Sequence, residues 1–159
     1  MRKVSRLKKV GKPFKEAIRK QRIQLAMLID TDGSINATKH GRPHVKVGMS
    51  SKMPVILWKL WGGYISKRKE PGKKVHYEWE INERVRVRAV LLTIKHYLQL
   101  KQPQARLALK MIDLLENKPE GYEQKLKLLA KELSRLNHAP SPDIDLEKFV
   151  DTHKREVKR

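Results

Sequence analysis

The sequence contains no cysteine, and this absence removes several classes of protein at once. Disulfide-stapled scaffolds, zinc fingers with cysteine ligands and enzymes with a cysteine nucleophile are all excluded. Long hydrophobic runs are also missing, since the apolar stretch near the N-terminus, residues 23–29, contains Gln24 and ends at Asp30. It is far shorter than the roughly 20 residues that cross a bilayer and lacks the pattern of a signal peptide, so we expect a soluble, intracellular protein.

Acidic residues are scarce relative to basic ones. The 159 residues include 37 Lys and Arg against 17 Asp and Glu, which gives a formal charge of +20. Such an excess favours a polyanionic partner, either nucleic acid or a membrane surface. Hydrophobic residues still make up 39% of the chain, which is enough for the core of one domain over residues 1–159 and too much for a disordered basic tail.

The positive charge is unevenly distributed along the chain. Residues 1–22 contain ten Lys and Arg and one acid, and residues 39–76 repeat this ratio. Residues 111–151 reverse it, with nine acids and six bases. This separation predicts that one face of the molecule lies toward phosphates and another away from them. The alternative is the highly charged surface of a thermophilic protein, but such surfaces pair their charges, and the first two segments are unpaired.

Hydrophobic spacing predicts alternating helices and strands, in the order α-ββ-α-ββ-α with further C-terminal helices. The expected fold is α+β: a twisted antiparallel sheet of four strands, with helices packed on one face and the other face open. We expect a core over about 14–136, a basic arm over 1–12 and a last helix over 143–159. Helices are predicted at 13–31, 54–61, 83–98, 103–115 and 122–136, and strands at 34–38, 44–48, 64–68 and 75–81.

Alternation along these strands, together with the turn between the first two, assigns a set of polar side chains to the open face. A twisted antiparallel sheet with such residues can lie in the major groove of DNA and read base edges, while Lys and Arg bind phosphates. The alternative is an ordinary solvated face. The candidates for DNA contact are Asn36, Thr38, His40, Arg42, His44, Lys46, Ser66, Arg68, His76 and Glu78.

The most informative stretch is residues 25–33, which read Leu-Ala-Met-Leu-Ile-Asp-Thr-Asp-Gly. Asp32 stands at the C-terminus of the predicted helix, where its charge opposes the helix dipole and calls for compensation, usually by a divalent cation. An EF-hand loop is excluded because the glycine falls at the fourth position rather than the sixth, and Gly41 replaces the terminal glutamate. A capped turn with a solvated acid pair is the alternative.

This nonapeptide resembles the LAGLIDADG motif of homing endonucleases, which it matches at seven of nine positions, departing at Met27 and Thr31. Residues 98–110 are similar to the segment that follows the sheet in single-motif members, and the predicted order of elements is also the family's. The resemblance covers roughly residues 14–135. It implies a homing endonuclease that hydrolyses phosphodiester bonds in both strands of a DNA target.

The resemblance also implies roles for individual residues. Asp32 would bind the catalytic metal, assisted by the main chain of Thr31, and Asp30 would stabilise the turn. Lys101 aligns with a lysine thought to polarise the scissile phosphate or to organise the attacking water. Ser51 falls near a position where some relatives carry a glutamine that positions water, so it is a further catalytic candidate.

A single motif implies that two chains are needed. The resemblance predicts a homodimer on a long pseudo-palindromic duplex, with the motif helices in contact through Leu25, Ala26 and Ile29. It implies Mg²⁺ as cofactor, with Mn²⁺ expected to substitute and Ca²⁺ to bind without turnover. No membrane partner or small-molecule substrate is expected. The compartment would be the cytoplasm of a prokaryote or the organelle of an organellar intron, and the composition also fits an intron of archaeal rRNA.

Other functions stay open at the level of sequence. A cleavage-deficient relative that binds DNA or RNA, such as an intron-splicing maturase, would keep the fold, but the intact Asp32 favours an enzyme. A basic ribosomal-type protein would explain the charge and not the motif. A zinc site at His40 and His44 is disfavoured because Gly41 and Pro43 break any helix that would align the two rings. The spacing predicts structural roles for Trp58, Trp61 and Trp79.

Overall fold

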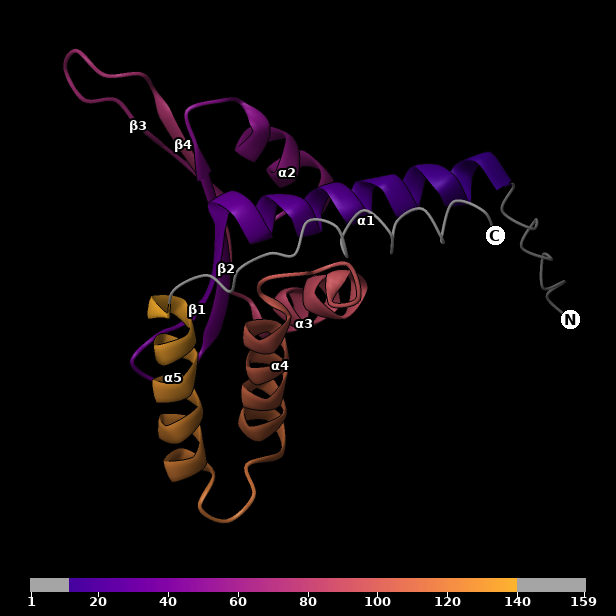
Figure 1. Ribbon diagram of the computed structural model, residues 1–159. Helices are drawn as coiled ribbons and strands as arrows, with labels where there is room; N and C mark the ends of the chain where they lie inside the picture. The colour runs from indigo at the N-terminus through magenta and orange to yellow at the C-terminus, as the bar shows by residue number, and fades with distance from the viewer. Residues whose placement is uncertain (1–11, 140–159) are drawn as a thin grey trace, which may run out of the picture.

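The computed structural model describes residues 12–139. The predicted basic arm, apart from its last residue, and the predicted helix at 143–159 lie outside this range. Nine elements follow one another along the described chain (Figure 1). No helix within 12–139 has the length and apolar character of a membrane span. The elements are α1 (Lys12–Asp32), β1 (Gly33–Ala37), β2 (Pro43–Met49), α2 (Met53–Trp61), β3 (Tyr64–Arg68), β4 (His76–Ile81), α3 (Arg84–Ile94), α4 (Gln102–Asn117) and α5 (Tyr122–His138).

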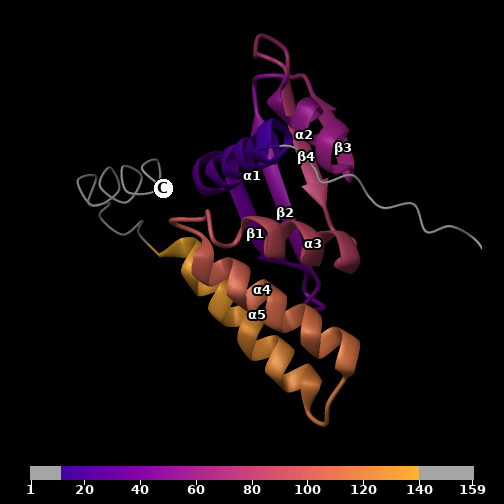
Figure 2. The same cartoon turned by 90° about the vertical axis from the view of Figure 1, so that its right-hand side faces the viewer.

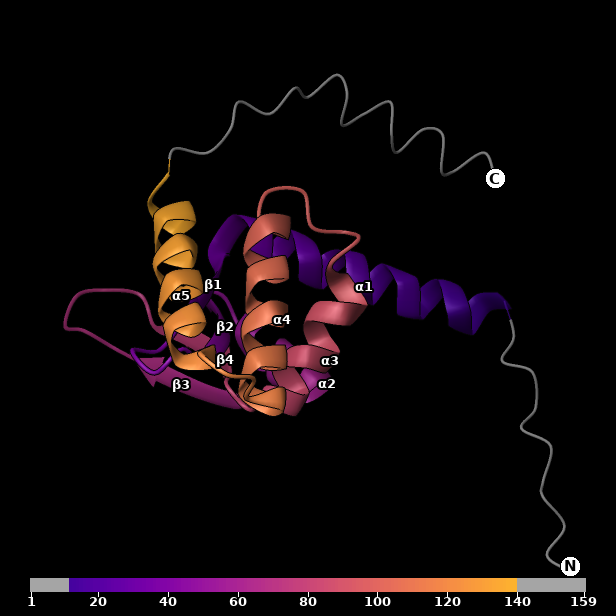
Figure 3. The ribbon, with the colours of Figure 1, turned by 90° about the horizontal axis from the view of Figure 1, so that it is seen from below.

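The four strands form one antiparallel sheet in the order β1-β2-β4-β3. The α+β fold predicted from the sequence is confirmed. Figures 1 and 2 show α1, α2 and α3 together on one side of the sheet. Figure 3 shows α4 and α5 side by side, and α5 also packs against the edge strand β1. The other face of the central strands is left open.

Period-two alternation explains why the sheet has one buried face. Val47 and Trp79 stand opposite each other in the register of β2 and β4, and both are fully buried. Leu25 and Ile29 of α1 cover this face and belong to the same core. The Trp79 indole donates a hydrogen bond to the Gly62 carbonyl oxygen (2.7 Å), so its polar atom is satisfied inside the core. A smaller cluster of Met111, Leu126 and Leu133 joins α4 to α5.

Two expectations differ from the structure. The helix predicted to reach Leu98 ends at Ile94, and residues 95–101 form turns. Leu98 continues the apolar spacing because it is buried, but it enters the core from a turn. Trp58 is 41% exposed, so its predicted structural role is wrong. The apolar stripe of α2 that faces the core is carried instead by Pro54 and Leu57.

Candidate functional site

The end of α1 and the start of β1 share one abrupt junction. Asp32 is the last residue of α1, its side chain is exposed, and Gly33 begins β1 at once. A Cβ atom at position 33 would lie 2.6 Å from the Ile29 Cα and 2.9 Å from the Lys46 carbonyl oxygen. Only glycine fits there. The glycine therefore lets the chain turn from helix to strand directly, which holds Asp32 at the edge of the sheet.

Asp30 connects this junction to a segment about 70 residues further along the chain. The residue is 8% exposed, and its carboxylate accepts hydrogen bonds from three consecutive backbone N–H groups. The Gln99 N–H donates to Oδ2 (2.7 Å), and those of Leu100 and Lys101 donate to Oδ1 (3.3 and 2.9 Å). The sequence analysis expects Asp30 to stabilise the turn of the motif itself, whereas its carboxylate is bonded to the distant turn that precedes α4.

Lys101 is brought to the C-terminal end of α1 by this connection. Its ammonium group donates a hydrogen bond to the main-chain oxygen of Asp30. The side chain is partly buried. Burial lowers the pKa of Lys101 below its ordinary value, and the negative charges of Asp30 and Asp32 act in the opposite direction. The end of the helix thus presents a carboxylate and a cation together, and the cation compensates the carbonyl end of the helix dipole.

Thr31 lies beside the same carboxylate. Its hydroxyl oxygen is 2.9 Å from the Met27 carbonyl oxygen and 2.9 Å from Asp32 Oδ2. One hydroxyl proton can be donated to only one of these acceptors at a time. The structure therefore places Thr31 within reach of Asp32, whereas the role of its main chain in metal binding stays a prediction.

Ser51 is placed differently. It lies just before α2, where its hydroxyl accepts a hydrogen bond from the Met53 N–H (3.3 Å) and approaches the Met49 sulfur (3.9 Å). These contacts are local, and within residues 12–139 none joins Ser51 to Asp32 or Lys101. Its catalytic role stays a prediction.

The predicted DNA-contacting residues fall into two groups. Register pairs such as Asn36 with His44 and Arg68 with His76 place seven of them on the open face of the sheet. Thr38, His40 and Arg42 lie in the exposed turn between β1 and β2. The same register adds three residues to the open face that the sequence analysis missed, although Ser34 and Glu80 follow the alternation that was used. These residues are Ser34, Tyr64 and Glu80.

The side chains on the open face differ in whether they already have a partner within the chain. Lys46 lies between Glu78 and Glu80, with nitrogen–oxygen distances of 3.4 and 3.3 Å. Burial acts to lower the pKa of Lys46, but the two glutamates together raise it above its ordinary value. His44 carries a buried Nδ1 without a hydrogen-bond partner, and burial lowers its pKa. Asn36 accepts a hydrogen bond from the Asn137 amide of α5 (2.5 Å).

The predicted dimer contacts need correction. Leu25, Ala26 and Ile29 are fully buried in the core of their own chain, where they pack beneath the sheet, so they cannot face a second copy. The exposed face of α1 runs along the other side of the helix, and Met27 is 56% exposed on it. Both departures from the LAGLIDADG motif lie on this face. We call it the α1 seam; it consists of Ala17, Lys20, Gln24, Met27 and Thr31.

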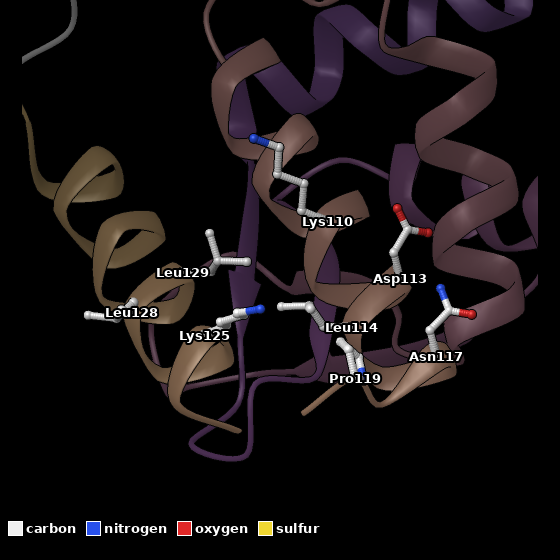
Figure 4. A pocket seen from close by; sticks show the side chains of 8 residues that line it. All are labelled: Lys110, Asp113, Leu114, Asn117, Pro119, Lys125, Leu128 and Leu129. Carbon is white, nitrogen blue, oxygen red and sulfur yellow. The ribbon is translucent and has the colours of Figure 1, made fainter. Parts of the chain in front are cut away.

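A pocket of about 450 Å³ lies between α4 and α5 (Figure 4). It is mainly apolar, with Leu114 from one helix and Leu129 from the other. None of the candidate site residues lines it. Its lining residues are Lys110, Asp113, Leu114, Asn117, Pro119, Lys125, Leu128 and Leu129.

Comparison with solved structures defines the class of fold: it is the fold of the LAGLIDADG homing endonucleases. The homing endonuclease I-CvuI, in complex with its target in the presence of Ca, superposes with a TM-score of 0.66 at 23% identity, covering 88% of this chain and 96% of that one. The archaeal intron-encoded endonuclease I-Vdi141I, complexed with DNA, gives a TM-score of 0.63 at 16% identity, covering 82% and 92%.

A longer relative shows that this chain holds one unit of the fold. I-SmaMI, a LAGLIDADG homing endonuclease bound to cleaved DNA, superposes with a TM-score of 0.53 at 12% identity. The match covers 79% of this chain and only 53% of I-SmaMI, compared with 96% of I-CvuI. No protein-family profile and no curated protein sequence matches the chain.

Proposed function

We propose that this chain is a site-specific double-strand DNA endonuclease of the LAGLIDADG homing type, which works as a homodimer with a divalent metal. One observation carries the proposal: Asp32 is exposed at the junction of α1 with the sheet, with Lys101 held beside it. The motif around Asp32, the fold and the net charge of +20 all support it. DNA is present in an I-CvuI complex and in the I-Vdi141I complex, which supports duplex DNA as the substrate.

The residues at this junction fit a hard divalent cation. Mg²⁺ is bound through oxygen, typically by one or two carboxylates together with substrate phosphates. Asp32 offers an exposed carboxylate with the Thr31 hydroxyl near one oxygen, whereas that of Asp30 is occupied by three N–H donors. No cluster of three His, Cys, Asp or Glu that could hold a metal occurs within residues 12–139. Asp32 and the Thr31 main chain would therefore hold the ion jointly with DNA phosphate, water and the second copy.

Hydrolysis requires an in-line attack of water on phosphorus and departure of the 3′ oxygen. When bound, the metal would supply charge stabilisation and an activated water. Lys101 would stabilise the negative charge that builds up on the phosphate oxygens in the transition state, because its ammonium group is already positioned by Asp30. The open face of the sheet would bind the groove and align the scissile bond with Asp32. Two chains would then cut one strand each.

The proposal is tested by a cleavage selection. Purified protein is incubated with a plasmid library of random sequence in Mg²⁺, in Mn²⁺, in Ca²⁺ or in EDTA, and the new DNA ends are sequenced. We expect discrete double-strand ends around a pseudo-palindrome in Mg²⁺ and Mn²⁺, and none in Ca²⁺ or EDTA. Tight DNA binding without ends in any metal would contradict the nuclease and favour a relative that only binds nucleic acid.

Dimerisation through the α1 seam would bring the two Asp32 residues together. We expect Met27→Glu to weaken the dimer, because it places like charges opposite each other where two seams meet. Juxtaposed like charges cost several kcal/mol, so the dissociation constant should rise by about 100-fold or more. Sedimentation equilibrium would show a mass near 18.6 kDa for the variant and about twice that for the original chain.

The matched control is Leu128→Glu. Leu128 is 69% exposed on α5, so the same new charge is introduced on another apolar side chain outside the α1 seam. This variant should remain dimeric. A dimer that survives Met27→Glu, or that is lost equally in Leu128→Glu, would place the contact elsewhere.

A further inference from the structure

A larger cavity lies at the outer end of the sheet, away from Asp32. Its volume is about 760 Å³, and it is lined by the turn between β1 and β2, the connection from β4 to α3, and residues near the α4–α5 connection. Figure 1 shows this β1–β2 turn beside α5. Because β1 starts directly after Asp32 and a strand rises about 3.3 Å per residue, the turn is about 20 Å from that carboxylate.

The cavity is positively charged, and most of its cations are unpaired. Among the described residues, none of the Lys39, Arg42, Lys118 and Lys127 side chains takes part in an ion pair. Two acids line the cavity, and one of them, Glu83, forms an ion pair with Arg86, which is not a lining residue (Glu83 Oε2 to Arg86 Nε, 3.6 Å). Like charges from separate segments repel one another unless an anion lies between them. We call this site the cationic cavity; its basic lining residues are Lys39, His40, Arg42, Arg84, Lys118 and Lys127.

The backbone at Lys118 bears on why a lysine stands at this position. Lys118 is the C-cap of α4 and adopts a left-handed conformation (φ 43°, ψ 53°). It is the one non-glycine residue with positive φ within 12–139. Glycine or asparagine is favoured at such a position, because a Cβ atom there is strained. Glycine would adopt this backbone conformation with less strain than lysine. What lysine adds at this position is a positive charge at the cavity.

We infer that the cationic cavity binds the phosphate backbone of duplex DNA in the outer part of each half-site. The inference rests on the proposed function, because it assumes a duplex lying along the open face of the sheet. The turn that carries His40 and Arg42 lies at the end of that face and also lines the cavity. Closely spaced phosphates match a group of cations from three segments, four of which lie outside any ion pair among the described residues. Such contacts fix the position of a duplex without reading its sequence.

The cavity also changes how the acidic segment at 111–151 is understood. Two of its acids, Asp113 and Glu116, are held by Arg88 at 2.7 and 2.6 Å. Two of its bases, Lys118 and Lys127, line the cationic cavity. A segment expected to face away from phosphates thus contributes cations to a phosphate site.

The test compares the salt dependence of DNA binding in the full chain and in two variants, Lys118→Gly and Lys118→Gly/Lys127→Gln. Affinity is measured by fluorescence anisotropy in Ca²⁺ with a long duplex, over a series of salt concentrations. Each lost phosphate contact should reduce the slope of log K against log salt by about 1, so the double variant should lose about 2. Lys118→Gly relieves the backbone, and its unfolding midpoint in urea should equal or exceed that of the original chain.

The matched control is Lys125→Gln. Lys125 is on the same helix as Lys127, but it lines the apolar pocket between α4 and α5 rather than the cationic cavity. The slope of this variant should stay unchanged. A double variant that keeps the original slope, or loses no more than the control, overturns the inference. If the double variant loses affinity for a structured RNA but keeps its affinity for the duplex, the assignment of DNA as the ligand is also overturned. Failure of the original chain to bind any duplex contradicts the proposed function itself, so the two failures are distinguishable.

Discussion

Replacement of Asp32 by asparagine should abolish DNA cleavage while DNA binding is kept. The amide has nearly the same size as the carboxylate and can still accept a hydrogen bond from the Thr31 hydroxyl. It lacks the negative charge that a divalent cation requires, and the phosphate would no longer be stabilised at the cut. We expect the single-turnover cleavage rate in Mg²⁺ to fall on the order of a thousand-fold or more. Affinity for the duplex, measured in EDTA so that no metal links Asp32 to phosphate, should stay within a few-fold because the acidic side chain itself makes no favourable contact with phosphate.

The control for this experiment is the same chemical change at Asp113. That carboxylate is exposed on α4 and pairs with Arg88, so Asp113→Asn removes one charge and one surface ion pair away from the α1–β1 junction. An exposed pair contributes roughly 0–1 kcal/mol to stability, and cleavage should be unaffected. Cleavage by Asp32→Asn at a rate close to the original would remove Asp32 from the mechanism.

Local patterns in the sequence predict most of the fold. The strand at 64–68 and the abrupt stop of the first helix before Gly33 follow from alternation and from a single glycine. The prediction extends the helix over residues 95–98, which form turns instead, because Leu98 continues the helical apolar spacing. The backbone N–H groups of the next three residues, 99–101, are bonded to Asp30. A hydrogen-bond partner about 70 residues away leaves no signal in a local window, so the turn could not be predicted.

The candidate site, like the fold, is only partly predictable from local sequence patterns. The motif identifies Asp32, but it does not say how Lys101 reaches it, because that depends on the carboxylate of Asp30. Helical spacing also shows that one side of α1 is apolar without showing what covers it. Leu25 and Ile29 are covered by the chain's own sheet, which is why the proposed dimer contact is assigned to the more polar α1 seam. Charge counted along the sequence likewise misses the cationic cavity, because its cations come from three separate segments.

Replacement of Asp30 by asparagine should reduce both stability and cleavage. The buried carboxylate offers two acceptor oxygens to the N–H groups of Gln99, Leu100 and Lys101. An amide keeps one acceptor and turns an NH₂ group toward at least one of these donors. Lost hydrogen bonds to a charged group, with a buried N–H left unpaired, should lower the free energy of unfolding by about 2–4 kcal/mol. Urea denaturation measures this loss.

Cleavage by the Asp30 variant should also fall, because the turn that carries Lys101 is no longer held against α1. A double-mutant cycle with Lys101→Met separates this effect from stability, at a temperature where every variant is folded. If Asp30 acts through Lys101, Asp30→Asn should cost at least about 100-fold in cleavage rate alone and little more in the Lys101→Met background. Its cost in unfolding free energy should persist there, because the backbone N–H groups still need their acceptor. Independent, multiplying losses of cleavage in the two variants would show that Asp30 does not work by positioning Lys101.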